Sequence, residues 1–317
     1  MYSFVNFVQM TYNPMEMNHI IKSQQFDQKL INQIFAIAST LEKKKDSSLK
    51  GKIMASLFYE PSTRTRFSFE SAMIRLGGSV ISTENAEEFS SVAKGETLED
   101  SIKVINNYVD VIVLRHSEEG SAERAALVST VPVINAGDGA GQHPTQALLD
   151  LYTIKRKLGK IEGITIALVG DLKHGRTIRS LSYLLGKYQN IKIYFVSPMG
   201  LRIGEDIKIY LKEQGTNYEE TTDLLSVIGK IDVLYQTRIQ KERFVNKKEY
   251  EKFNGCYTID KEMVNKMKSK SIIMHPLPRV NEILTEVDNL HQAVYFKQTY
   301  YGLLIRMALL KIVAGKS

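Results

Sequence analysis

Short apolar and β-branched runs alternate along this chain with longer segments in which apolar residues recur at helical spacing. Strands read as near-continuous apolar runs when helices cover both faces of a parallel sheet. We predict strands at residues 53–58, 79–82, 109–114 and 131–135, and again at residues 164–169, 192–196, 232–235 and 271–274. The pattern therefore predicts an α/β fold with two domains, each a mostly parallel sheet with helices on both faces.

The helical segments of the first half fall between these strands, at residues 26–44, 64–76, 98–107 and 122–129. We place the joint between the domains in the helix after His143, because Pro144 suits a first helical position and Leu148, Leu151 and Tyr152 supply a buried stripe. The predicted domains are residues 1–150 and 151–297. A last apolar segment, residues 301–313, has the length and period of a helix, which we extend to about residues 298–317.

Polar residues follow several of the predicted strands, namely Ser62, Arg115, His143, Asp171 and His275. In open parallel sheets, ligands bind beyond the carboxyl ends of the strands. We therefore expect these five side chains to converge on one cleft.

The composition is that of a globular protein, with 317 residues, 43% of them hydrophobic and 24% charged. The longest apolar runs, such as residues 164–169, are too short to cross a bilayer, so we expect no membrane contact. The first residues lack a basic segment typical of a secretory signal. The single cysteine, Cys256, excludes an intrachain disulfide and fits a reducing compartment, so we expect a cytoplasmic protein.

The net charge of +7 raises the question of a nucleic-acid partner. The lysines are spread along the chain with only short clusters such as residues 43–45, which is typical of solvated helix faces, so we expect no nucleic acid. The six histidines form no cluster with ligand spacing. The sequence therefore indicates no metal site.

The segment from Glu60 to Arg66 places hydroxyls and two guanidiniums at the start of a predicted helix. Pro61 and Ser62 are helix start signals, with Ser62 as a plausible N-cap, and a buried stripe follows at Phe69, Met73 and Leu76. Unpaired amides at a helix start favour an anion, and arginines add charge-assisted hydrogen bonds. The segment predicts a phosphate site, with an ordinary capped helix as the alternative.

Two more segments stand at wide separation, GQHPTQ at residues 141–146 and HPLPRV at residues 275–280. Together with STRTR at residues 62–66 they resemble, in the same order, the signature segments of the aspartate/ornithine transcarbamoylase family. The likeness runs from about residue 20 to about residue 313. The stretch TRIQKER at residues 237–243 resembles the aspartate-binding loop, and Pro276 stands where ornithine enzymes typically carry cysteine. The resemblance is therefore to the aspartate branch.

The resemblance implies an enzyme that transfers the carbamoyl group of carbamoyl phosphate to the amino group of L-aspartate, in de novo pyrimidine biosynthesis. The products would be N-carbamoyl-L-aspartate and phosphate. Such a transfer requires a polarised carbonyl, a stabilised oxyanion and a neutralised leaving phosphate, but no cofactor. The resemblance assigns the catalytic roles to Arg64, Thr65, Arg115 and His143.

For carbamoyl phosphate, the resemblance assigns the phosphate contacts to Ser62, Thr63, Arg64 and Thr65. It places Thr65, Arg115 and His143 around the carbonyl oxygen. Gln146 and the backbone carbonyls of Leu277 and Pro278 would bind the carbamoyl NH₂, which agrees with the ability of amide and backbone oxygens to accept from it. The alternatives are a solvated Arg115 at a strand end and a structural His143.

For L-aspartate, the resemblance assigns Arg176 and Arg238 as carboxylate anchors, supported by Gln240. Two separate guanidiniums suit a dicarboxylate and would repel the cationic side chain of ornithine. A structural role is the alternative for Arg238. The resemblance also implies that Glu60 pairs with Arg176 and Arg243, which would link the two domains when the cleft closes.

Residues 90–96 are mostly small and polar and indicate a loop. The resemblance implies that Ser90 and Lys94 reach the carbamoyl phosphate and aspartate sites of a neighbouring subunit in a homotrimer, with Ser91 as the alternative serine. Without the resemblance, Lys94 is interpreted as a solvated lysine. The resemblance further implies that the C-terminal helix packs back on the first domain, and it leaves open a regulatory chain or another pyrimidine enzyme as partner.

A rival interpretation is a nucleotide-binding loop at residues 170–177, which approximate G-x-x-x-x-G-K-[ST]. Arg176 replaces the decisive lysine, and no acidic strand end is placed for Mg²⁺. A second rival is a non-catalytic homologue, which would be expected to lose Arg64, Arg115, His143 or Lys94, yet all four are present. A transcarbamoylase for another amine is the third.

Overall fold

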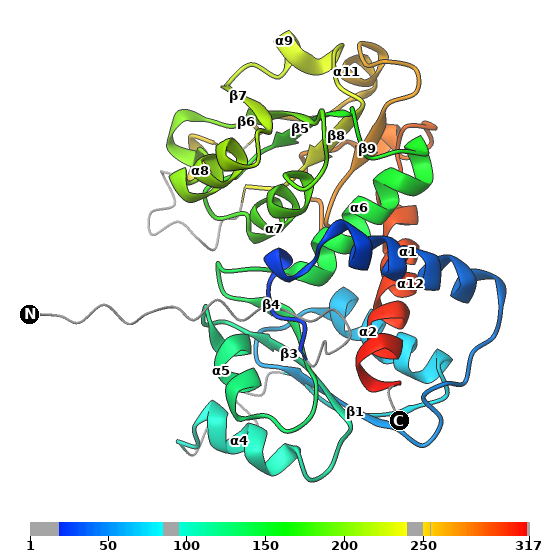
Figure 1. The fold of residues 1–317 in the computed structure, drawn as a ribbon. Coiled ribbons are helices and arrows are strands. Elements are labelled where there is room, and N and C mark those ends of the chain that lie inside the picture. Colours follow the sequence, from blue (N-terminus) through cyan, green and yellow to red (C-terminus); the bar gives the residue numbers. More distant parts are fainter. Residues whose placement is uncertain (1–18, 85–94, 240–249, 254, 316–317) are drawn as a thin grey trace, which may run out of the picture.

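The computed structural model describes residues 19–84, 95–239, 250–253 and 255–315. These residues form two parallel sheets stacked along the long axis of the molecule (Figure 1). The fold is therefore the predicted two-domain α/β architecture, with helices on both faces of each sheet.

The first sheet has four strands in the order β2-β1-β3-β4, and all of its pairs are parallel. Its strands are β1 (Ile53–Phe58), β2 (Ser79–Glu84), β3 (Val111–His116) and β4 (Val133–Asp138). Its helices are α1 (Gln28–Lys43), α2 (Thr63–Arg75), α4 (Leu98–Ile105) and α5 (Ser121–Val128). A short 3₁₀ turn, η2 (Ser23–Gln25), precedes α1.

The second sheet has five strands in the order β7-β6-β5-β8-β9, also parallel throughout. Its strands are β5 (Thr165–Val169), β6 (Lys192–Val196), β7 (Asn217–Thr221), β8 (Val233–Gln236) and β9 (Ile272–Met274). The accompanying helices are α7 (Arg176–Leu185), η4 (Met199–Leu201), α8 (Glu205–Glu213), α9 (Leu225–Ile228), α11 (Lys261–Asn265) and η6 (Thr285–Val287).

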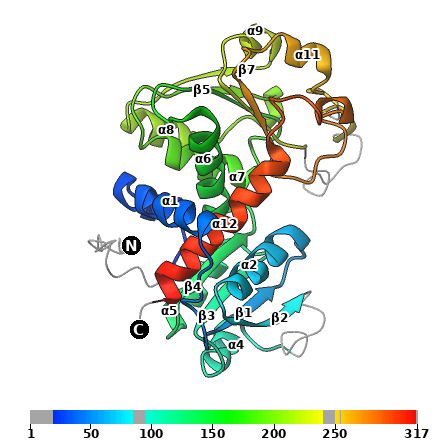
Figure 2. The same cartoon turned by 90° about the vertical axis from the view of Figure 1, so that its right-hand side faces the viewer.

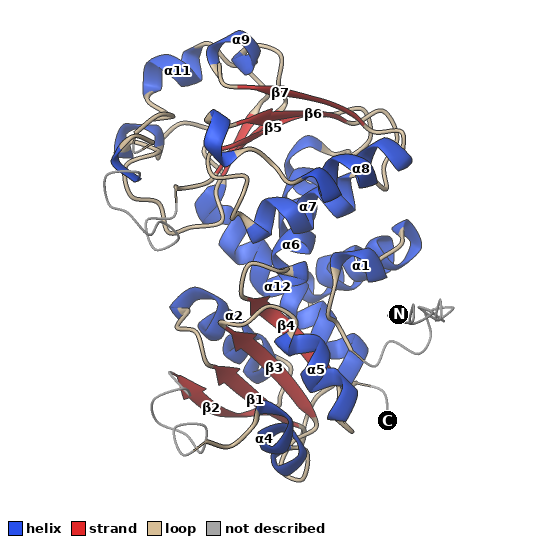
Figure 3. Ribbon diagram, turned by 90° about the vertical axis from the view of Figure 1, so that its left-hand side faces the viewer, coloured by secondary structure: helices blue, strands red, loops and turns tan. Residues whose placement is uncertain are grey.

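Helices lie on both faces of the first sheet (Figure 3), and alternation along its strands divides the core into layers. In β1, Met54 and Phe58 are buried with α1 and α2, whereas Ala55 and Leu57 face α4 and α5. Successive side chains of a strand point to opposite faces, so an apolar run buries both faces at once. This arrangement explains why the central strands were recognisable as uninterrupted apolar runs.

Two long helices connect the layers, α6 (Pro144–Leu158) and α12 (Tyr295–Ala314). The helix α12 packs against α1, α2 and α6, and it crosses the molecule diagonally in Figure 2. Pro144 is the first residue of α6, as predicted, and residues 144–154 of α6 are buried throughout. Because residues 144–154 of α6 are covered on all sides, they fix the two sheets relative to each other.

Most predicted element bounds agree with the structure, and the deviations have local causes. The strands β3 and β4 begin and end about two residues later than predicted, since their ladders continue into polar residues such as Arg115 and Asp138. Backbone pairing does not depend on side-chain polarity. The edge strand β7, with the sequence NYEET, was missed because it is half exposed and carries no apolar run.

Candidate functional site

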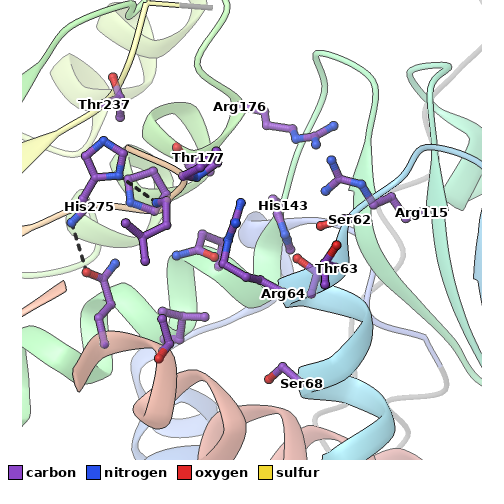
Figure 4. A pocket seen from close by; sticks show the side chains of 18 of the residues that line it. Ser62, Thr63, Arg64, Ser68, Arg115, His143, Arg176, Thr177, Thr237 and His275 are labelled. Carbon is purple, nitrogen blue, oxygen red and sulfur yellow. Dashed lines mark hydrogen bonds between the residues drawn. The ribbon is translucent and has the colours of Figure 1, made fainter. Parts of the chain in front are cut away.

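A cavity of about 600 Å³ lies between the two sheets, at the carboxyl ends of several strands. Residues from both halves of the chain line it, together with three positions of the C-terminal helix, Gln298, Thr299 and Arg306. It collects most of the residues that the sequence singled out: Ser62, Thr63, Arg64, Thr65, Arg115, His143, Gln146, Arg176, Arg238, Leu277 and Pro278. Figure 4 shows ten of the lining side chains labelled, facing one another from different elements.

The helix α2 begins at this cavity. Ser62 occupies the N-cap position, as predicted, but its hydroxyl accepts no hydrogen bond from the helix. Its backbone carbonyl accepts instead, from the amide of Arg66 at 3.0 Å. The hydroxyl of Ser62 and the first-turn amides are therefore not used by the helix itself, and an anion can bind to them.

Two other helices also start at the cavity. His143 precedes Pro144 at the start of α6, and Gly175 precedes Arg176 at the start of α7. Each N-terminus carries a partial positive charge from the aligned peptide dipoles. The cavity therefore receives the positive ends of three helices.

Charged side chains add to the positive potential of the three helix N-termini. Five arginines but only one carboxylate, Glu60, are among the described residues that line the cavity. The guanidinium of Arg64 forms no hydrogen bond or ion pair with any other part of the chain that the structure describes. Burial lowers the pKa of Arg64, and the neighbouring Arg238 lowers it further. Because arginine stays protonated even so, the site is built for an anion.

Glu60 holds two of the arginines. Its Oε2 lies 2.8 Å from Nη2 of Arg115 and 3.1 Å from Nη2 of Arg176. Arg176 also donates through Nη1 to the carbonyl of Gly139 at 2.7 Å. Gly137 adopts a φ of 117°, and a Cβ there would lie 3.0 Å from Nη1 of Arg115, so glycine leaves room for the guanidiniums.

The Glu60–Arg176 contact joins the two halves of the chain, as the resemblance implied. Arg243, the other expected partner of Glu60, lies outside the described residues. Arg115 was not expected to pair with Glu60. It is only 9% exposed, which is inconsistent with the alternative of a solvated arginine at a strand end.

His143 is buried beside these arginines. Its backbone amide donates to Oγ of Ser180 at 2.9 Å, which anchors the start of α6 to α7. Burial lowers the pKa of His143 well below its usual range, and the positive charges of Arg176, Arg115 and Arg306 lower it further. The imidazole is therefore neutral at physiological pH and can donate one hydrogen bond without carrying a charge.

Gln146 lies one turn along α6, where its Nε2 donates to Oδ1 of Asp150 at 2.8 Å. On the opposite side of the cavity, Nδ1 of His275 accepts from the amide of Leu277 at 2.7 Å. Nε2 of the same ring lies 2.8 Å from Oε1 of Glu282. Since Nδ1 accepts, Nε2 carries the proton and donates to Glu282. His275 thus shapes the loop that presents Leu277 and Pro278.

The expectation that Asp171 joins the cleft was wrong. Asp171 is fully buried away from the cavity and accepts from the amide of His174 at 3.0 Å. The turn that contains it begins at Gly170, where a Cβ would lie 2.3 Å from the carbonyl of Thr237. This close approach to β8 requires glycine for packing, which explains the glycine of the supposed nucleotide loop.

Three predicted site residues, Ser90, Lys94 and Gln240, lie outside the described residues. Sequence reasoning missed several lining residues, namely Ser68, Thr177, Gln298 and Arg306. One of them left a signal in the sequence, since Arg306 is one of only two charged residues in the apolar run of residues 301–313. Arg306 is 4% exposed and donates through Nη1 to Oγ of Ser68 at 2.8 Å.

Among residues 19–84, 95–239, 250–253 and 255–315, no group of three or more His, Cys, Asp or Glu side chains is placed to hold a metal ion. Within the same ranges, no helix has both the length and the apolar character to span a membrane.

The fold and the cavity together define a class of two-domain α/β proteins that bind an anionic ligand between their sheets. Two family models match this chain and place it within that class. The carbamoyl-P binding domain of aspartate/ornithine carbamoyltransferases matches residues 18–156, and the Asp/Orn binding domain matches residues 162–313. The chain therefore belongs to the aspartate/ornithine carbamoyltransferase family and is a carbamoyltransferase.

Individual relatives are similar over nearly the whole chain. The chloroplastic aspartate carbamoyltransferase of Arabidopsis thaliana is 56% identical over 304 residues, which cover 94% of this chain and 78% of the relative. The catalytic subunit of M. jannaschii aspartate transcarbamoylase has a solved structure with a TM-score of 0.87 at 53% identity, covering 94% of this chain and 98% of that one.

A third comparison is with a structure that contains ligands. Aspartate transcarbamoylase from Trypanosoma cruzi, in complex with carbamoyl phosphate and aspartate, has a TM-score of 0.90 at 42% identity. The match covers 94% of this chain and 97% of that chain.

Proposed function

We propose that this chain is an aspartate carbamoyltransferase, which transfers the carbamoyl group of carbamoyl phosphate to the amino group of L-aspartate. The reaction forms a carbon–nitrogen bond and breaks the carbonyl carbon–oxygen bond to phosphate, while the amine loses one proton. The observation that carries the proposal is a single cavity in which an unpaired guanidinium at a helix N-terminus, Arg64, faces further guanidiniums from the other sheet.

The phosphate group binds to what we call the phosphate wall, formed by residues 62–65 with Arg115 and His143. The hydroxyl of Ser62, the first-turn amides of α2 and the guanidinium of Arg64 supply donors that the helix does not use. These donors neutralise the charge that gathers on the leaving phosphate. Fixed donors of this kind cost no reorganisation during the reaction.

The carbonyl oxygen of the substrate becomes an oxyanion when the amine attacks. We place Thr65, Arg115 and His143 around this oxygen. The pKa of His143 is held well below its usual range by burial and by the nearby arginines, so the ring acts as a neutral hydrogen-bond donor. A neutral donor stabilises the oxyanion without titrating at physiological pH.

The carbamoyl NH₂ needs acceptors rather than donors. We assign this role to the side-chain oxygen of Gln146 and to the backbone carbonyls of Leu277 and Pro278, all of which line the cavity. L-Aspartate binds to what we call the acceptor wall, formed by Arg176, Arg238 and residues 275–278. Two guanidiniums on one wall suit a dicarboxylate and disfavour ornithine.

The direct test is a colorimetric assay for carbamoylated product, with L-aspartate, ornithine and small diamines offered side by side. We expect N-carbamoyl-L-aspartate from the purified chain. Product from ornithine or a diamine but not from aspartate would overturn the acceptor assignment. An inactive chain that still binds carbamoyl phosphate would identify a non-catalytic member of the family.

We also propose that the active form is a homotrimer with shared sites. Ser90 and Lys94 lie outside the described residues, so their assignment to a neighbouring subunit's site rests on the sequence resemblance, as does the support of aspartate by Gln240. A regulatory chain or another pyrimidine enzyme is a candidate partner. We further place the protein in the cytoplasm and the boundary between its domains near residue 150, within α6.

Mixed trimers test the sharing of sites. Lys94→Ala and Arg64→Ala chains are each expected to be nearly inactive, because every site in either homotrimer lacks one group. A trimer with one chain of one kind and two of the other regenerates one complete site, so reassociated mixtures recover about one third of the activity per hybrid trimer. Verified hybrids that stay as inactive as their parents would show that Lys94 serves its own subunit or no site.

A further inference from the structure

A buried carboxylate that does not line the cavity forms hydrogen bonds with residues that do. Asp150 lies on α6 one turn after Gln146 and is fully buried. Its Oδ1 accepts from Nε2 of Gln146 at 2.8 Å and from Nε2 of Gln298 at 2.6 Å, and its Oδ2 accepts from the hydroxyl of Tyr235 at 2.7 Å. The carboxylate is therefore shared by α6, α12 and β8.

This carboxylate decides which end of Gln146 faces the cavity. The two ends of a glutamine amide have nearly the same shape, and their hydrogen-bonding partners determine the orientation. A carboxylate only accepts, so it draws Nε2 of Gln146 toward itself and repels Oε1. The amide oxygen of Gln146 is left as the group that the side chain can offer to the cavity that it lines.

A second branch of the network reaches the opposite wall. Gln298 donates to Asp150 through Nε2 and accepts from the amide of His275 through Oε1 at 3.1 Å. His275 in turn accepts from the amide of Leu277. Asp150 thus fixes the orientation of both glutamines, and through Gln298 it supports the loop that presents the carbonyls of Leu277 and Pro278.

We propose that Asp150 is a positioning residue that makes the cavity selective for a substrate with an NH₂ group next to the carbonyl. The inference rests on the proposed function, in which Gln146, Leu277 and Pro278 accept from that NH₂. A site built from acceptors rejects a ligand that lacks the donors, because buried acceptors are then left unpaired. Acetyl phosphate is the matching probe, since a methyl group replaces the NH₂ and the phosphate is unchanged.

The experiment measures the affinities of carbamoyl phosphate, acetyl phosphate and inorganic phosphate by calorimetric titration. It is done at pH 8.5, because burial raises the pKa of Asp150 to about 7 and the carboxylate is ionised above that value. For Asp150→Ala we expect the preference for carbamoyl phosphate over acetyl phosphate to fall roughly tenfold, the usual scale for misplacing a buried hydrogen-bonding group. Binding of inorganic phosphate is expected to change less than about twofold, because the phosphate wall is intact.

The conservative variant Asp150→Asn is expected to retain most of the preference. Its side-chain oxygen can accept from both glutamines while its NH₂ donates to the hydroxyl of Tyr235, which accepts as well as donates. The matched control is Thr153→Val, which alters another buried polar residue of α6. Within the described ranges, the hydroxyl of Thr153 bonds only to its own helix, through the carbonyl of Leu149. We expect wild-type preference in this control.

The outcomes separate the possible roles of Asp150. An unchanged preference of Asp150→Ala for carbamoyl phosphate over acetyl phosphate would overturn the proposal. An equal loss of affinity for all three ligands would also overturn it, because Asp150 would then only stabilise the fold. If Asp150→Ala does not fold, Asp150→Ser carries the same test, because its shorter hydroxyl cannot reach both glutamines. Failure of the wild-type chain to form N-carbamoyl-L-aspartate would instead contradict the proposed function.

Discussion

The two walls of the cavity differ in how much of their charge the protein already uses. On the phosphate wall, the guanidinium of Arg64 forms no hydrogen bond or ion pair within the described ranges, and the hydroxyl of Ser62 does not cap its helix. On the acceptor wall, Arg176 is held by Glu60 and by the carbonyl of Gly139. Arg64 on the first wall is therefore ready for an anion, whereas Arg176 on the second already holds a carboxylate. Glu60 supplies that carboxylate, and it holds Arg115 of the first wall as well.

This difference has a consequence for how each substrate binds. An anion at the phosphate wall can bind the guanidinium of Arg64 without displacing a protein group of the described ranges, and the backbone there is fixed by α2. A carboxylate at Arg176 must share the guanidinium with Glu60 or displace it. Because Glu60 also holds Arg115, a rearrangement at one wall can be transmitted to the other through a single carboxylate.

The largest expected effect comes from the unpaired guanidinium of the phosphate wall. Arg64→Ala is expected to lower turnover at saturating substrates by roughly two or more orders of magnitude, because it removes charge that stabilises the leaving phosphate. Steady-state kinetics measure this. Arg75→Ala, at the exposed far end of the same helix, is the control and is expected to stay within about twofold. Near-normal turnover in Arg64→Ala would refute the phosphate-wall assignment.

A smaller and more selective effect is expected at the acceptor wall. Arg238→Ala is expected to weaken succinate or aspartate binding by roughly tenfold to a hundredfold, the scale of a lost charge-assisted pair, while carbamoyl phosphate binding changes little. Calorimetric titration of each ligand measures the two effects. Arg238→Lys keeps the charge but not the bidentate fork, so it should fall between alanine and the wild type. An equal loss of affinity for both ligands would contradict the assignment of Arg238 to the acceptor wall.

The smallest expected effect concerns pH and His143. The pKa of this ring is lowered by burial and by nearby arginines, so protonation is disfavoured in the folded state and begins only well below pH 6.5. The ring therefore stays neutral from pH 8 down to about pH 6.5. NMR titration should show no chemical-shift change for His143 across that range, with His143→Gln used for assignment. A midpoint near 6.5 would contradict the neutral-donor role.

The lowered pKa of His143 also makes the stability of the fold depend on pH. A histidine with a lowered folded pKa binds fewer protons in the folded state than in the unfolded state. Folding then becomes less favourable as the pH falls through the unfolded value near 6.5, because the unfolded chain gains the proton first. His143 is thus expected to destabilise the fold under acidic conditions.

Much of the fold was encoded locally. The strand β1 and the stripe of Phe69, Met73 and Leu76 followed from apolar spacing alone, since burial of an amphipathic or fully covered element requires that spacing whatever its neighbours are. Pro144 likewise marked the start of α6 through its own backbone constraint. The edge strand β7 was not predicted, because its pairing uses backbone groups rather than apolar side chains.

The sequence by itself determined the two parallel sheets, the family signatures and the cationic start of α2, because each depends on residues a few positions apart. Only the tertiary structure decided that Asp171 turns away from the cavity, that Arg306 enters it and that Asp150 orients Gln146. Asp150 meets Tyr235 across 85 positions and Gln298 across 148. Which buried donor meets which acceptor over such separations is fixed by the packing of α6 and α12, and no local pattern records it.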